Sequence, residues 1–146
     1  MRLIIQRVAS AVVRIDYKIF VQIKQGLVVF VGFGKQDTEK KLNQISHRLI
    51  KLRVFEDDAN KMNLALAEVG GEILLVPNFT LYGDLSQNRP SFLEALDFKQ
   101  AKKLFEKFTT SLKLKYSEAK VKTGVFGALM KVELVNDGPV TLLLDA

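Results

Sequence analysis

Short runs of β-branched and aromatic residues, separated by polar residues, fill the start of the chain. Residues 3–5, 11–15 and 19–21 have this pattern, which predicts three strands. Residues 27–31 are apolar without interruption and lie between two glycines. A continuous apolar run of that length is typical of a strand that is buried on both faces.

Two later segments have the spacing of amphipathic helices, with a strand at 72–76 between them. Asp37 or Thr38 can cap the first helix, which enters at Glu39. Pro77 either ends the ladder of the 72–76 strand or occupies an edge or a bulge. The predicted buried stripes are Leu42, Ile45, Leu49 and Leu52 in the first helix, and Ala101, Leu104, Phe105, Phe108 and Leu112 in the second.

Two polar stretches allow both a structural and a functional interpretation. Asn78 and Thr80 alternate with apolar residues after the 72–76 strand, so the ordinary interpretation is a strand with one solvated face. Residues 126–135 and 140–144 are also strand-like. The Asn-Asp-Gly-Pro sequence at 136–139 between them is strong turn chemistry, and a hairpin is its ordinary interpretation.

Strands outnumber helices in this pattern, and the helices do not alternate regularly with them. The sequence therefore predicts an α+β fold with a curled, largely antiparallel sheet or barrel-like core and two amphipathic helices. The 146 residues are expected to form a single domain, residues 1–146, which is long enough to bury one core.

The composition removes several classes of chemistry. With zero Cys, disulfides and thiolate chemistry are absent, which suits a reducing cytoplasm. The single His, His47, supplies neither a zinc shell nor a conventional triad, and we expect it on the helix surface. No apolar run reaches the roughly 20 residues that cross a bilayer. Polar residues interrupt the N-terminal apolar stretch after three positions, which argues against a signal peptide.

Other local patterns give weaker signals. Residues 56–58 are acidic but lack calcium-loop spacing, and a solvated turn is expected there. Residues 32–34, Gly-Phe-Gly, lack the third glycine of a dinucleotide fingerprint.

The net charge of +6 is concentrated in residues 99–122, which hold eight lysines against two acidic residues. The remaining chain has 14 basic and 14 acidic residues. This basic segment is either a phosphate-facing surface or a solvated helix face.

Seven motifs in register over nearly the whole chain resemble the D-aminoacyl-tRNA deacylases, also called D-tyrosyl-tRNA deacylases. The motifs are Gln6-Arg7-Val8, Leu52-Arg53-Val54-Phe55, Lys61-Met62-Asn63, Asn78-Phe79-Thr80-Leu81-Tyr82, Asn88-Arg89-Pro90-Ser91-Phe92, Thr123-Gly124-Val125-Phe126-Gly127-Ala128 and Asn136-Asp137-Gly138-Pro139-Val140-Thr141.

This resemblance implies hydrolysis of the ester that joins a D-amino acid, or mischarged glycine, to the 3′-terminal adenosine of tRNA. It also implies a cytoplasmic homodimer that needs no cofactor or metal and has its active site at the dimer interface. There Gly138-Pro139, with a cis peptide bond, enters the partner's pocket as a chiral filter.

The resemblance also assigns roles to individual residues. Catalysis falls to Asn78, Phe79 and Thr80, and the chiral filter to Gly138 and Pro139 with Arg7, Asn136 and Thr141. The adenosine pocket is expected from Phe126, Gly127, Ala128 and Met130, and tRNA phosphate contacts from Lys102, Lys103, Lys107, Lys113 and Lys115.

One departure concerns the catalytic motif, because Pro77-Asn78 stands where the family carries Ser-Gln. Asn is one methylene shorter than Gln, which changes the reach of the amide by roughly 1.5 Å, and Pro lacks a backbone N–H. Two alternatives therefore remain open. One is a catalytically altered or inactive tRNA-binding module, and the other is an interaction protein in which Gly138-Pro139 is only a turn.

Overall fold

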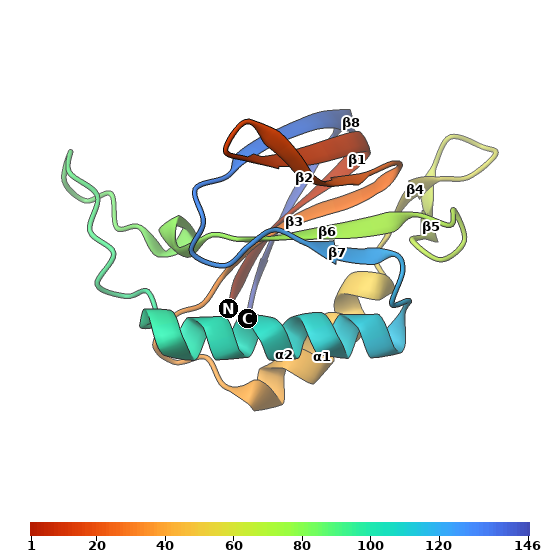
Figure 1. Ribbon diagram of the computed structural model, residues 1–146. Coiled ribbons are helices and arrows are strands. Elements are labelled where there is room, and N and C mark those ends of the chain that lie inside the picture. The colour runs from red at the N-terminus through yellow and green to blue at the C-terminus, as the bar shows by residue number, and fades with distance from the viewer.

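The computed structural model describes residues 1–146 as a curled sheet with two helices packed on one of its faces (Figure 1). None of the helices is long and apolar enough to span a membrane. The elements in chain order are β1 (Arg2–Ile15), β2 (Lys18–Ile23), β3 (Gly26–Gly32), α1 (Glu39–Ile50), β4 (Arg53–Glu56), β5 (Met62–Ala65), β6 (Glu72–Pro77), the 3-10 helix η1 (Phe79–Tyr82), α2 (Phe98–Lys115), β7 (Val121–Thr123) and β8 (Lys131–Asp145).

The main sheet has the order β2-β1-β3-β6-β7, and β8 pairs with the other edge of β1. All pairings of β1 are antiparallel, as are those of the small β4–β5 ribbon. The predicted α+β class, with a curled and largely antiparallel sheet and two helices, is confirmed. The β3–β6 and β6–β7 pairings are parallel. The helices supply the long connections that such pairings need, because α1 lies between β3 and β6 and α2 lies between β6 and β7.

The sheet is buried on both faces in its centre, which explains the uninterrupted apolar run of β3. Leu27, Val29 and Val31 pack into a core shared with α1 and α2. Val28 faces the opposite way, into a second core formed with β1, β2 and β6. The prediction that residues 27–31 are buried on both faces is therefore confirmed.

Both helices bury the stripes that their spacing predicts, although Leu52 lies just beyond α1 and is only partly buried. Thr38 is the N-cap of α1, but its side chain makes no capping bond. The Asp37 carboxylate accepts instead from the Gly34 N–H at 2.7 Å. Asp97 caps α2 by accepting from the N–H groups of Lys99 and Gln100.

Three strand predictions need correction. The runs at 3–5 and 11–15 belong to one strand, β1, because the intervening Arg7 is buried and has hydrogen-bond partners inside the protein. The strand expected to continue after Pro77 is replaced by η1, whose N-cap is Asn78. The strand predicted to begin at 126 begins only at Lys131.

The hairpin interpretation of residues 136–139 is wrong. Residues on both sides of this stretch pair antiparallel with the same strand, so β8 keeps its direction through it. Between two paired positions, Gln6 with Thr141 and Val8 with Asn136, β8 contains more residues than β1. Asn-Asp-Gly-Pro therefore forms a large bulge in an edge strand, where unpaired backbone is tolerated.

Packing of α2 can be tested with two leucines that lie two residues apart. Leu112 is fully buried and Leu114 is 83% exposed. We expect Leu112→Ala to lower the free energy of unfolding by about 2–5 kcal/mol and Leu114→Ala to change it by less than about 0.5 kcal/mol. Urea unfolding followed by circular dichroism measures both values. Equal effects of the two substitutions would contradict the orientation of α2.

Candidate active site

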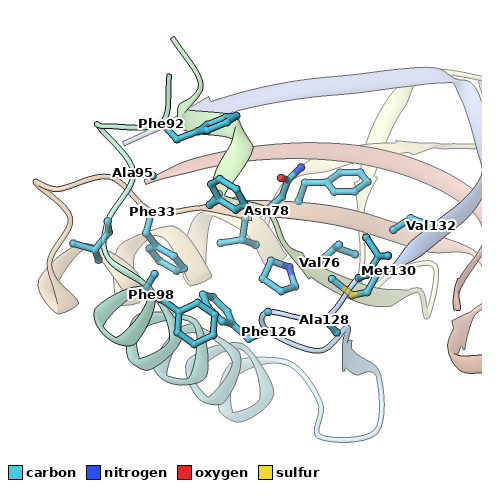
Figure 2. A pocket seen from close by; sticks show the side chains of 18 residues that line it. Phe33, Val76, Asn78, Phe92, Ala95, Phe98, Phe126, Ala128, Met130 and Val132 are labelled. Atoms are coloured by element: carbon cyan, nitrogen blue, oxygen red, sulfur yellow. The ribbon is translucent and has the colours of Figure 1, made fainter. Parts of the chain in front are cut away.

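A cavity of about 660 Å³ opens where β3 and β6 end, beside η1, the start of α2 and the loop between β7 and β8 (Figure 2). Fifteen of its 18 lining residues are hydrophobic, and Asn78 supplies the amide side chain among them. No lining residue carries an ionisable side chain. Such a cavity suits an aromatic or apolar ligand and leaves proton transfer to water, backbone groups or the ligand itself.

Aromatic pairs form two sides of the cavity. Phe126 contacts Phe98 edge to face, with ring centroids 5.2 Å apart, and Phe105 lies behind it at 5.7 Å. On another side, Phe79 contacts Phe92 at 5.0 Å. Figure 2 shows Phe98 and Phe126 together on one side and Phe92 on the other.

The four residues expected to hold adenosine all lie in the loop between β7 and β8 and line this cavity: Phe126, Gly127, Ala128 and Met130. Gly127 has a φ of +82°, and a Cβ there would lie 2.8 Å from the Phe98 ring. The loop can therefore approach α2 this closely only with glycine at this position.

Asn78 fixes the start of η1 through its side chain. Its Oδ1 accepts from the Thr80 N–H at 3.2 Å and from the Thr80 hydroxyl at 2.6 Å. The Thr80 hydroxyl proton is thus engaged, and its lone pairs remain to accept a hydrogen bond. Phe79 opens the helical turn, where an N–H has no preceding helical carbonyl as a partner. Its N–H is therefore the better candidate than that of Thr80 for stabilising negative charge.

Pro77 costs the sheet no hydrogen bond. The neighbouring Asn78 N–H donates to the Val31 carbonyl of β3 at 2.8 Å. Since successive residues of a strand point their N–H groups to opposite sides, the Pro77 nitrogen faces the β7 side. β7 pairs with β6 only at Ile73 to Leu75, so no strand needs a donor at Pro77.

The second group of expected residues surrounds the bulge of β8. The Gly138–Pro139 peptide bond is cis, and both residues are exposed. Arg7 is 4% exposed, and its guanidinium donates to the Asp137 carbonyl at 2.8 Å, the Val54 carbonyl at 2.8 Å and the Glu56 carboxylate at 3.3 Å. Arg7 therefore holds the residue that directly precedes Gly138.

The side chains of Asn136 and Thr141 are hydrogen-bonded to each other across the bulge. The Asn136 side chain accepts from the Val140 N–H at 2.7 Å and donates to the Thr141 hydroxyl at 3.1 Å. Gln6 also donates to this hydroxyl at 3.1 Å. Both side chains therefore shape the bulge in which Gly138 and Pro139 are exposed.

Within one chain, the two groups lie at opposite ends of the β1–β3 pair. Arg7 pairs with Leu27 at the start of β3, whereas Leu3 pairs with Val31, which binds Asn78. The four-residue interval corresponds to about 13 Å along the strand. A single chain therefore does not bring Gly138-Pro139 to the cavity.

The five lysines expected to contact tRNA phosphates fall into two groups, those without and those with a partner in the protein. Lys102 and Lys103 are exposed near the start of α2, which lines the cavity, and neither forms an ion pair. Lys107 pairs with Glu39, and Lys113 pairs with Glu118 at 2.7 Å. Lys115 donates to the Ser111 hydroxyl at 3.1 Å. Lys113 lies about 16 Å farther along the helix than Lys102.

The remaining sequence candidates have structural roles. His47 is exposed on α1, as predicted. Asp57 accepts from the N–H groups of Ala59 and Lys61, which confirms the solvated turn. Gly32 and Gly34 leave room for η1, because a Cβ at Gly34 would overlap the Tyr82 ring. No group of three His, Cys, Asp or Glu side chains is placed to hold a metal ion.

Sequence reasoning missed part of the cavity wall. Phe33, Phe92 and Phe98 line the cavity but were not among the expected site residues. A signal existed for Phe92 and Phe98, since each is a large aromatic residue in a segment that has neither helical nor strand periodicity before the second helix. Phe98 is 60% exposed despite its size, as expected for a cavity wall rather than a core residue.

Solved structures with this fold include two close matches. The chain superposes with a TM-score of 0.96 and 35% identity on the c-Myc DNA unwinding element binding protein, over 100% of this chain and 99% of the other. A probable eukaryotic D-amino acid tRNA deacylase matches with a TM-score of 0.87 over 99% and 98% of the chains. At 18% identity, this second likeness concerns the fold alone.

Sequence comparison identifies the family. A model described as D-Tyr-tRNA(Tyr) deacylase matches residues 4–145. D-aminoacyl-tRNA deacylases of Thermosipho melanesiensis and Clostridium perfringens are each 48% identical over 100% of this chain and 97% of their own length. The chain therefore belongs to the D-Tyr-tRNA(Tyr) deacylase family, as its motifs indicated.

The capping role of Asn78 leads to a prediction that does not depend on activity. Asn78→Asp keeps an acceptor at Oδ1 and should leave the amide exchange rate of Thr80 unchanged. Asn78→Ala removes a cap of about 1 kcal/mol and should raise this rate about fivefold. Hydrogen exchange measured by NMR compares the two variants. Equal rates in both would show that the cap does not hold η1.

Proposed function

We propose that residues 1–146 form one domain that hydrolyses the ester bond of D-aminoacyl-tRNA and of mischarged glycyl-tRNA. The products are the free amino acid and tRNA, and the reaction serves chiral proofreading in translation. The observation that carries this proposal is the cavity beside η1, which lacks ionisable side chains, in a chain of this family. We place the reaction in the cytoplasm and assign it no cofactor.

The chemistry follows from what the cavity contains. Water attacks the ester carbonyl, the bond to the ribose O3′ breaks, and O3′ takes up a proton. Because no side chain there can act as a base, we assign proton transfer to the neighbouring ribose 2′-hydroxyl and water. The Phe79 N–H stabilises the developing oxyanion. The Thr80 hydroxyl serves as an acceptor that positions water or substrate, since its own proton goes to Asn78.

The adenine of the tRNA end fits the aromatic part of the cavity. Phe126 presents a ring that Phe98 and Phe105 hold in orientation, and Gly127 and Ala128 leave space above the loop. Met130 adds a polarisable thioether, which packs well against aromatic rings. The Lys102 and Lys103 end of α2 then faces the phosphates that lead into the acceptor stem.

A homodimer completes the site in this proposal. Gly138 and Pro139 are exposed on β8, an edge strand on which Val135, Leu142 and Leu143 are also exposed. Such apolar residues on an open edge suit a second protein surface. Inserted into the partner's cavity, the carbonyls of this dipeptide bind the α-amino group and leave no room for an L side chain.

Comparing both enantiomers tests the function. We expect D-tyrosyl-tRNA to be hydrolysed and L-tyrosyl-tRNA to remain essentially intact, because the inserted carbonyls leave no room for the L side chain. Release of labelled tyrosine is the measurement. Binding of tRNA without hydrolysis would instead support the inactive module that Pro77-Asn78 suggests. Neither binding nor hydrolysis would support an interaction protein.

The composite site can be tested by mixing two variants. Asn78→Ala damages the cavity, and Gly138→Ala damages the inserted dipeptide, because a Cβ at Gly138 would lie 2.7 Å from the Val140 side chain. After subunit exchange, half of the dimers are mixed and each has one intact site, so about a quarter of wild-type activity should return.

Sedimentation of each variant provides the control for this mixing experiment. Both should have a mass near twice the 16.4 kDa of the chain. Dimeric variants that recover no activity on mixing would contradict a site shared between subunits.

The lysines should differ in their contribution to tRNA binding. Neutralising Lys102 and Lys103 with Gln should flatten the slope of log K against log salt by about two units. Lys113 binds Glu118 and Lys115 binds Ser111. Replacing these two lysines with Gln should therefore alter the slope by less than about one unit. Filter binding at several salt concentrations gives the slopes. Equal slopes for the two double variants would argue against a preferred contact near the cavity.

A further inference from the structure

The 3-10 helix η1 is only partly buried at the surface beside the cavity. None of its four residues is buried, and Phe79 is 58% exposed. Phe79 packs against Phe92, and Tyr82 lies close against Gly34. Polar contacts add to this limited packing. Asn78 holds its first residues, and a separate set of contacts holds its end at Leu81 and Tyr82.

Arg2 reaches the end of η1 from the start of β1. Its Nη1 donates to the Leu81 carbonyl at 2.6 Å, and its guanidinium carbon lies 5.0 Å from the centroid of the Tyr82 ring. The remaining donors, Nε and Nη2, bind the Asp145 carboxylate of β8 at 3.3 and 3.1 Å. One side chain thus connects η1 to two strands of the main sheet.

Tyr82 is held by a different contact at its hydroxyl group. The hydroxyl donates to the Asp37 carboxylate at 3.3 Å, and Asp37 also accepts from the Gly34 N–H and the Met1 nitrogen. Burial, together with the Asp37 charge, raises the pKa of Tyr82 to about 12, so its hydroxyl remains a donor well into the alkaline range. The ring therefore has a fixed position against which the Arg2 guanidinium can pack.

We propose that Arg2 is a positioning residue for the deacylation reaction, acting through η1. Resting on the proposed function, this inference deepens it: Arg2 holds the Leu81 carbonyl and thereby the placement of the Phe79 N–H and Thr80 at the cavity. Arginine suits this task because its planar fork can bind a carbonyl, a carboxylate and an aromatic face together. Lysine has the charge but cannot make all three contacts at once.

The chain offers a closely matched control in Arg14. Arg14 lies on the same strand, and its Nε binds Glu133 of β8 at 2.7 Å. The two ion pairs are equally exposed to solvent. The exposed fraction of the side chain is 34% for Arg2 and 52% for Asp145, and 33% for Arg14 and 55% for Glu133. Arg14 makes no contact with η1. A difference between the two substitutions therefore reports on the contact with η1 and not on the loss of a β1–β8 ion pair.

The experiment compares Arg2→Met, Arg2→Lys and Arg14→Met with the wild type. Met keeps a long apolar stem but has no donors. We expect Arg2→Met to lower kcat for D-tyrosyl-tRNA about tenfold with less than about a twofold change in KM, because small displacements of catalytic groups are costly. Arg2→Lys should recover part of this loss, and Arg14→Met should stay within about twofold of the wild type.

Hydrogen exchange of the Leu81 and Gly83 amides provides a second readout, independent of activity. These amides donate within η1, to Asn78 and Thr80. Exchange should be faster in Arg2→Met alone. Equal exchange in the two Met variants overturns the inference, and so does faster exchange without a loss of kcat in an active enzyme. An inactive wild type overturns the proposed function, whereas faster exchange in Arg2→Met would still support Arg2 as the residue that holds η1.

Discussion

The guanidinium of Arg7 is buried and must find partners for its N–H groups inside the protein, and much of the site follows from this constraint. Its donors go to the carbonyls of Val54 and Asp137 and to the Glu56 carboxylate. An unpartnered buried charge would cost several kcal/mol, so these contacts tie β4 and the bulge of β8 to the centre of β1. The exposed Gly138-Pro139 is in this way presented from a rigid base. The proposed chiral filter requires this, because a filter based on backbone position needs that backbone to be fixed.

The proposed site differs from that of most hydrolases in the kind of groups that its cavity offers. The cavity lacks ionisable side chains, and the groups to which we assign contact with the ester are a backbone N–H, an amide and a hydroxyl whose proton is already engaged. With such groups, the rate depends on placement more than on protonation state. In the proposed mechanism, this dependence accounts for the contacts that Arg2, Asn78 and Asp37 make with the two ends of η1.

The sequence predicted those parts of the fold that follow from local periodicity. Both helices and the doubly buried β3 follow from apolar spacing, whereas the change from strand to 3-10 helix after Pro77 was not predicted. The parallel pairings could not be predicted in this way, because pairing direction depends on how α1 and α2 cross the sheet. The hairpin prediction for Asn-Asp-Gly-Pro failed for a related reason, because the same residues suit both a turn and a bulge. A bulge is distinguished from a hairpin here only by the pairing of both flanking segments with β1. The site residues came from the resemblance, which also implied that Gly138-Pro139 serves the partner's pocket, and local periodicity alone indicated neither the residues nor their separation within one chain.

The replacement of Ser-Gln by Pro77-Asn78 can be judged by what each atom does. Pro77 gives up an N–H at a point where no strand requires one, so the backbone course of β6 and η1 does not change on its account. Asn78 is short enough for its Oδ1 to reach the N–H two residues later, a contact that Asn and Asp favour and that a longer Gln makes less readily. The pair therefore exchanges a hydroxyl and a longer amide for a more rigid start of η1. A change of this kind acts on the shape and polarity of the cavity rim, where we place the amino acid of the substrate, and leaves the Phe79 N–H in place. We therefore expect its consequence in the choice of D-amino acid before any loss of the hydrolytic step.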